Sequence, residues 1–104
     1  MKQFDVYANI DTDTSQAYPY FVDVQTELLD SLHSRVVIPL TEALADHSLP
    51  NNICPKVEID GKKYYLLTYQ ITTVSSSFLR KHENTLLLNR SEIINSIDFL
   101  ISGI

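Results

Sequence analysis

The spacing of apolar residues changes along the chain, and this change divides it into a region of strands and a helix. From residue 4 to residue 74, apolar and polar residues alternate, or β-branched and aromatic residues cluster, as in half-buried strands. The pattern predicts strands over 4–9, 18–25, 35–40, 56–59, 63–67 and 69–74. Because proline cannot donate a hydrogen bond to a sheet, we expect Pro19 at the start or edge of its strand and Pro39 at the end of the next.

The connections between these strands carry their own signals. Asp60-Gly61 separates two alternating runs and is typical of a two-residue hairpin turn in which both residues need positive φ. We expect a polar loop over 10–16, and a loop with local hydrogen bonds at the serine run 75–77. A short helix is predicted over 41–47, where a capping residue precedes good helix formers.

The last part of the chain has the period of an amphipathic helix. Apolar residues recur there at intervals of three and four, at Ile93, Ile94, Ile97, Leu100, Ile101 and Ile104. Asn89 and Glu92 have the spacing of a capping box. We therefore expect a helix that begins near Asn89 and runs to the last residue.

Length and composition indicate one globular domain over residues 1–104, with Phe4, Val24, Ile38 and Leu67 in its core. The chain has 104 residues, of which 44% are hydrophobic and 20% charged. Two glycines and one cysteine exclude a dinucleotide fingerprint, a P-loop, a Cys-x-x-Cys motif and an intrachain disulfide. The three histidines are too far apart to form a metal-binding pair on one helix. We expect no cofactor and no metal, and Cys54 as a small buried hydrophobe.

The charge balance favours a protein partner over a nucleic acid. The formal net charge is −5, from 13 acidic and 8 basic residues, and the basic residues are scattered. Nucleic-acid binding depends largely on Lys and Arg, so we expect no direct nucleic-acid binding by the chain alone. We find no signal sequence and no apolar run of membrane-spanning length, and therefore expect a cytoplasmic protein with no membrane partner.

Several short motifs, taken in their order along the chain, resemble the CcdB family of bacterial toxins. They are Gln3-Phe4-x-Val6-Tyr7, Phe-Val-Asp-Val-Gln at 21–25, Val-Ile-Pro-Leu at 37–40, Pro55 before a Val-x-Ile strand, and an isoleucine-rich helix ending in Gly103-Ile104. The resemblance covers about residues 3 to 104. It implies a mainly β (α+β) fold, an SH3-like β-barrel with a C-terminal helix shared by CcdB and MazF toxins, in a symmetric homodimer.

The resemblance also implies a function without covalent chemistry, and therefore no catalytic residues. Toxins of this family bind the A subunit of DNA gyrase and trap the gyrase–DNA cleavage complex, and a cognate CcdA-like antitoxin from the same operon neutralises them. Family positions that face gyrase correspond here to Asp98, Ile101, Ser102, Gly103, Ile104, Gln3, Phe4, Tyr7, Thr26 and Leu28.

Two other functions stay open from the sequence. Endoribonuclease toxins of MazF type share the fold and need clustered Arg, His or acidic side chains, for which Asp30, His33 and Arg35 are the nearest candidates. A non-toxic homologue that binds only the antitoxin is the second alternative. It arises because family members commonly have Trp where this chain has Ser102, and a buried aromatic anchor carries much interface energy.

Overall fold

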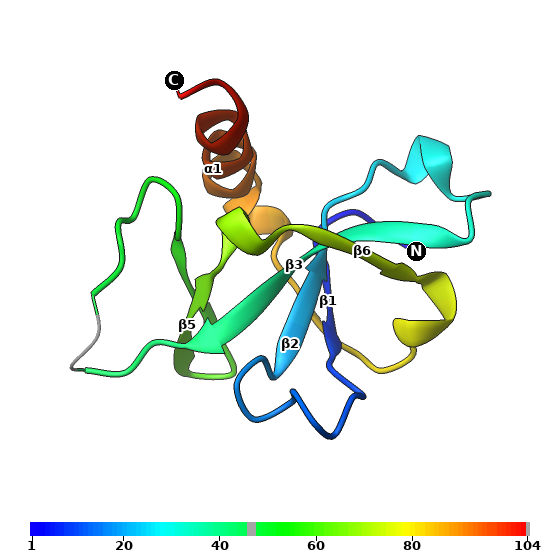
Figure 1. Cartoon of the computed structure of the whole chain (residues 1–104), viewed down its shortest axis with the longest axis horizontal. Coiled ribbons are helices and arrows are strands. Elements are labelled where there is room, and N and C mark those ends of the chain that lie inside the picture. The colour runs from blue at the N-terminus through cyan, green and yellow to red at the C-terminus, as the bar shows by residue number, and fades with distance from the viewer. Residues whose placement is uncertain (46–47, 104) are drawn as a thin grey trace.

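The computed structural model describes residues 1–45 and 48–103, which form a curled antiparallel sheet followed by one α-helix (Figure 1). The strands are β1 (Asp5–Ala8), β2 (Tyr20–Asp23), β3 (Ser34–Glu42), β4 (Lys56–Ile59), β5 (Lys62–Leu66), β6 (Thr72–Ser75) and β7 (His82–Thr85). Their order is β4-β5-β3-β2-β1-β7, and β6 pairs with β3 beside β5. This half-barrel with the C-terminal helix α1 (Arg90–Ser102) confirms the predicted fold class.

Strand β3 joins the two halves of the sheet, because it changes its partner partway along one edge. Its residues 34–37 pair with β6, whereas residues 40–42 pair with β5. Pro39 lies at the change, and its carbonyl accepts a hydrogen bond from the Leu67 N–H at 2.9 Å. The prediction that Pro39 ends the strand is wrong. Proline has no N–H to donate, but on that edge of β3 this position lies between the residues that pair with β6 and those that pair with β5, so the strand continues through it.

The predicted hairpin is confirmed, whereas the predicted helix that precedes it is not. Asp60 and Gly61 connect β4 to β5 with φ of 51° and 82°, as a two-residue turn requires. The helix predicted over 41–47 is wrong, since Thr41 and Glu42 belong to β3, residues 43–45 are irregular, and 46–47 lie outside the described residues.

The strand predicted over 69–74 starts later than expected. Residues Thr68–Gln70 form a 3₁₀ turn, η2, and only β6 is extended. The serine run is likewise more regular than a loop: Ser75 ends β6 and Ser76–Phe78 form the 3₁₀ turn η3. Ser75 Oγ and Ser77 Oγ lie 2.9 Å apart, so the local hydrogen bond here joins two side chains, whereas we expected bonds from side chain to backbone.

The alternating side chains of the strands build cores on both faces of the sheet. The main cluster contains Phe4, Val6, Val22, Val24, Ile38, Leu40, Val57, Ile59, Tyr64, Leu66, Leu86 and Ile93. Two smaller clusters, one around Tyr7 and Val37 and one around Cys54, Tyr65 and Leu67, pack elsewhere. Neighbours in sequence such as Tyr64 and Tyr65 belong to different clusters, as the period of two predicts. The four core residues expected from the sequence and Cys54 are all buried.

Helix α1 is anchored at its first half. Ile93 is fully buried in the main core, with Ile94 and Ile97 half-buried against it. The Ser96 hydroxyl, also buried, lies 2.9 Å from the Thr68 hydroxyl of η2. Thus only the N-terminal part of the predicted apolar stripe serves as core.

The two ends of α1 differ from their predicted forms. At the start, the Asn89 amide donates to the Glu92 carboxylate at 3.1 Å, so these side chains pair with each other rather than forming the reciprocal capping box. At the end, Gly103 has φ 75° and donates its N–H to the Phe99 carbonyl at 2.9 Å. The helix therefore ends at Ser102 rather than at the last residue, and Ile104 lies outside the described residues.

Within the described ranges, the helices are too short or too polar to cross a bilayer.

Candidate functional site

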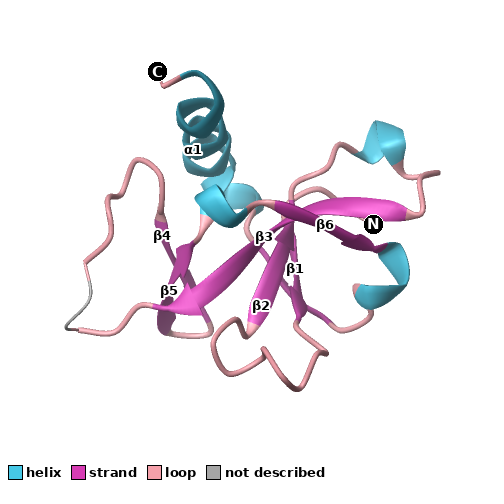
Figure 2. Cartoon of the chain, viewed as in Figure 1, coloured by secondary structure: helices cyan, strands magenta, loops and turns pink. Residues whose placement is uncertain are grey.

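The last turn of α1 presents an apolar surface to solvent. Ile101 is 79% exposed, and Phe99 and Leu100 beside it are 36% and 37% exposed. The end of α1 projects away from the sheet (Figure 2). We call Phe99, Leu100 and Ile101 the helix tip.

The residues that flank the helix tip are exposed and form hydrogen bonds within the last turn of α1. The Ser102 hydroxyl donates to the Asp98 carbonyl one turn earlier, at 2.7 Å, and so lies back along the helix. The hydrogen bond from Gly103 to Phe99 closes the final turn and gives the tip a defined end. Of the residues expected at this surface, Asp98, Ile101, Ser102 and Gly103 are exposed together.

A second exposed surface lies on residues 26–33, between β2 and β3, which we call the η1 segment. Every residue from 26 to 34 is exposed, and Leu28, in the 3₁₀ turn η1 (Glu27–Leu29), is 90% exposed. The Thr26 hydroxyl accepts from the Leu28 N–H at 3.3 Å and caps this turn. Figure 2 shows η1 well away from the end of α1, so the predicted site residues form two separate surfaces in one chain.

The three N-terminal site candidates lie mostly inside the molecule. Gln3 is half-buried and donates its side-chain amide to the Val24 carbonyl at 3.0 Å, next to the η1 segment. Phe4 is 1% exposed and Tyr7 is 6% exposed. The fold therefore places Phe4 and Tyr7 in two apolar clusters of the core rather than at a surface that a partner could contact.

A buried ion-pair network underlies the η1 segment, and Arg35 is its centre. Its guanidinium contacts the Asp23 carboxylate at 2.8 Å and the Asp30 carboxylate at 2.6 Å, and donates to the Gln25 carbonyl at 3.2 Å. The side chains of Arg35 and Asp23 are 1% and 0% exposed. Burial raises the pKa of Asp23, and the hydrogen bond from Arg35 opposes that rise.

This network bears on the group considered for RNA cleavage. Arg35 and Asp30 do meet, but in an ion pair whose arginine is buried and whose carboxylate is partly exposed, whereas His33 is exposed. The Arg35 guanidinium is enclosed by the protein and is not presented to a phosphodiester. From the sequence, Arg35 and Asp30 were named as candidates and Asp23 was not. Its position in a strand expected to be buried was a signal that this carboxylate needs a charged partner.

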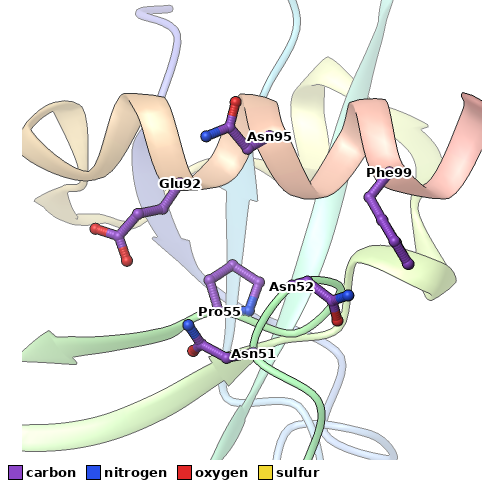
Figure 3. Close-up of a pocket in the computed structure, with 6 residues that line it drawn as sticks. All are labelled: Asn51, Asn52, Pro55, Glu92, Asn95 and Phe99. Atoms are coloured by element: carbon purple, nitrogen blue, oxygen red, sulfur yellow. The ribbon is translucent and has the colours of Figure 1, made fainter. Parts of the chain in front are cut away.

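A groove of about 400 Å³, with both polar and apolar lining, separates α1 from the segment before β4. Its lining residues are Asn51, Asn52, Pro55, Glu92, Asn95 and Phe99. Figure 3 shows Glu92 and Phe99 of the helix directed toward the segment that carries Asn51, Asn52 and Pro55. The sequence did not indicate it, because its two walls are 37 or more residues apart along the chain, counting from Pro55 to Glu92. Its Phe99 wall is continuous with the helix tip.

Across residues 1–45 and 48–103, no three His, Cys, Asp or Glu side chains converge as a metal site.

The chain is a small mainly β protein in which a curled antiparallel sheet is followed by one C-terminal helix. The helix is anchored at its start and exposed at its end, and this is the fold that the resemblance to CcdB toxins implies. The chain belongs to the CcdB family, because the family model described as CcdB protein matches residues 3–103. Membership in this family makes the chain a toxin of the toxin–antitoxin class.

Proposed function

We propose that this toxin binds the A subunit of DNA gyrase, traps the gyrase–DNA cleavage complex, and is neutralised by a cognate CcdA-like antitoxin. The observation that carries the proposal is the family match over residues 3–103, which includes the exposed candidates Thr26, Leu28, Asp98, Ile101, Ser102 and Gly103. The exposed helix tip supports it, since binding a protein requires apolar surface that the free chain leaves uncovered.

The helix tip is suited to binding because its support is rigid. The first half of α1 is fixed by Ile93 and Ser96, and the last turn is closed by Gly103. With Ser102 at the position where the family commonly has Trp, Ile101 supplies the most exposed apolar side chain of the final turn. Burying such a side chain contributes about 2 kcal/mol to an interface.

We further propose that the toxin acts in the cytoplasm as a symmetric homodimer. A two-fold dimer would present two copies of the helix tip to the two-fold pair of gyrase subunits. Sedimentation of the purified protein tests this part directly, and a mass of one chain, 11.9 kDa, at micromolar concentration would contradict it.

Induced expression in a gyrase-competent bacterium tests the function. We expect the full chain to stop growth and the chain lacking residues 102–104 to be harmless, with Ile101→Ala intermediate. Leu88→Ala is the matched control, because Leu88 is fully exposed in the turn before α1 but lies outside the proposed surface. Purified gyrase should accumulate cleaved DNA with the full chain only. Harmless full-length expression, or killing that survives the deletion, would contradict the proposal.

A further inference from the structure

The segment that displays Thr26 and Leu28 has almost no apolar anchor of its own. All residues from 26 to 34 are exposed, and η1 is only three residues long. A short exposed turn of this kind is stable only where other groups hold it, since ordering each residue costs about 1–2 kcal/mol. The conformation of this segment must therefore be set by polar contacts from beneath.

Most of those contacts converge on Arg35 and Gln25, and the Asp30 carboxylate also accepts from the Met1 amino group at 3.3 Å. Arg35 donates to the Gln25 carbonyl at the start of the segment and to Asp30 directly after η1. The Gln25 side chain accepts from the Val36 N–H at 3.1 Å and donates to the Leu29 carbonyl at 3.3 Å. Both ends of the turn are thereby tied to β3.

The two carboxylates of the network have different positions. Asp23 is fully buried in β2 and accepts the Arg35 Nε–H at 2.9 Å, which fixes the guanidinium in the sheet. Asp30 is 45% exposed and belongs to the displayed segment. Arg35 is thus held by one carboxylate and holds the other.

We propose that Arg35 is a positioning residue for the gyrase-binding surface: anchored by Asp23, it holds Asp30 and Gln25 so that Leu28 is presented in a single conformation. The inference rests on the proposed function, because it takes Leu28 as a gyrase contact. The buried position of Arg35 means that it acts through the segment and touches no partner itself.

Asp30→Ala is the informative variant, because it removes the segment's 2.6 Å contact with Arg35, together with the weaker 3.3 Å contact of Asp30 with the Met1 amino group, and leaves the buried Arg35–Asp23 pair intact. Glu27→Ala is its matched control, with the same loss of charge in the same exposed turn but no role in the Arg35 network. In the free protein, we expect amide hydrogen exchange at positions 29 and 30 to accelerate about fivefold in Asp30→Ala and to stay unchanged in Glu27→Ala. The melting temperature should change little in either variant.

Affinity for the gyrase A subunit then tests the positioning. We expect Asp30→Ala to weaken binding about fivefold and Glu27→Ala to leave it unchanged. In the Leu28→Ala background, Asp30→Ala should have little further effect, since a positioning residue acts only through the side chain that it positions.

Each other outcome overturns the inference. Independent, multiplicative losses from Asp30→Ala and Leu28→Ala would mean that Asp30 itself contacts gyrase. Equal behaviour of Asp30→Ala and Glu27→Ala in both measurements would mean that the network does not order the segment. If the unaltered chain fails to bind gyrase, the proposed function fails, and the exchange rates of the free protein still decide whether Arg35 orders the segment.

Discussion

Phe4 shows how one residue can connect the N-terminus to the core at a cost in backbone strain. It is a non-glycine residue with φ 72°, a conformation that costs about 1–3 kcal/mol. Its N–H donates to the Asp23 carbonyl, its carbonyl accepts from the Leu86 N–H at 2.7 Å, and its ring is buried. These contacts offset the strain, and the turn they enforce brings Gln3 beside Val24, next to the η1 segment.

Tyr7 gives a prediction about alkaline pH. Burial raises its pKa above the ordinary value of 10.0, and the carboxylates of Asp5 and Asp23 raise it further. For an acid whose folded pKa is raised, the stabilisation is complete below the unfolded pKa and is lost as pH rises through the folded pKa. We therefore expect the native protein to lose stability above about pH 10.

Absorbance at 295 nm measures the ionisation of tyrosine, and urea unfolding between pH 8 and 12 measures the free energy of unfolding over the same range. Tyr7→Phe should reduce the alkaline fall in the free energy of unfolding, because the phenyl ring has no proton to release. An identical fall in the unaltered chain and in Tyr7→Phe would show that Tyr7 does not contribute.

At the scale of elements, α1 combines two tasks that are separated along its length. Its first half completes the main core, and its last turn has the exposed helix tip. Sequence periodicity indicated one continuous stripe, because both halves use the same apolar residue types at the same spacing. The last turn projects away from the sheet (Figure 1).

The same substitution should therefore affect stability in the first half of α1 and partner binding in the second half. Ile93→Ala should lower the free energy of unfolding by about 2–5 kcal/mol, because it leaves a cavity in the core. Ile101→Ala, at a 79% exposed position, should leave stability nearly unchanged and weaken gyrase binding. Urea unfolding and a binding titration on both variants check this, and a large loss of stability in Ile101→Ala would show that the tip is packed in solution.

At the scale of the whole molecule, the sheet links three apolar clusters through the residues of shared strands. Val37 and Ile38 of β3 belong to different clusters, as do Tyr64 and Tyr65 of β5. Disrupting one cluster displaces strands that the others need. We expect the described part of the chain to unfold as one cooperative unit.

Cys54 provides a probe for this cooperativity. It is 1% exposed in a cluster separate from the main core, and burial raises the pKa of its thiol, so the native protein should react slowly with a thiol reagent. In urea, the midpoint for Cys54 labelling should coincide with that for loss of helix measured by circular dichroism. Earlier labelling of Cys54 would show that its cluster opens independently.

The elements that depend on local pattern could be located from the sequence. The β4–β5 hairpin follows from Asp60-Gly61 and its alternating flanks, and α1 follows from its 3.6-residue period. Strands β1 and β3, the buried residues expected in the core, and the family resemblance were likewise available from the sequence. The elements rest on residues that are close together in the chain, and the resemblance rests on short motifs that are each local and occur in a set order.

The features that the sequence missed are decided by pairing between distant segments. Strand β7, with the sequence His-Glu-Asn-Thr, has no apolar alternation and is extended because β1 provides its hydrogen bonds. Pro39 stays within β3 because the partner strand changes there. In each case the neighbouring strand supplies what the local residues do not specify.

The division of the candidate site into exposed and buried members has the same origin. The sequence by itself determined the strand and helix periods, the acidic charge and the motifs of the family. Only the tertiary structure decided that Ile101 is exposed while Ile93 is buried, that Phe4 and Tyr7 lie inside, and that Arg35 joins two carboxylates. Burial and ion pairing depend on which surfaces meet in space, and spacing along the chain does not specify that.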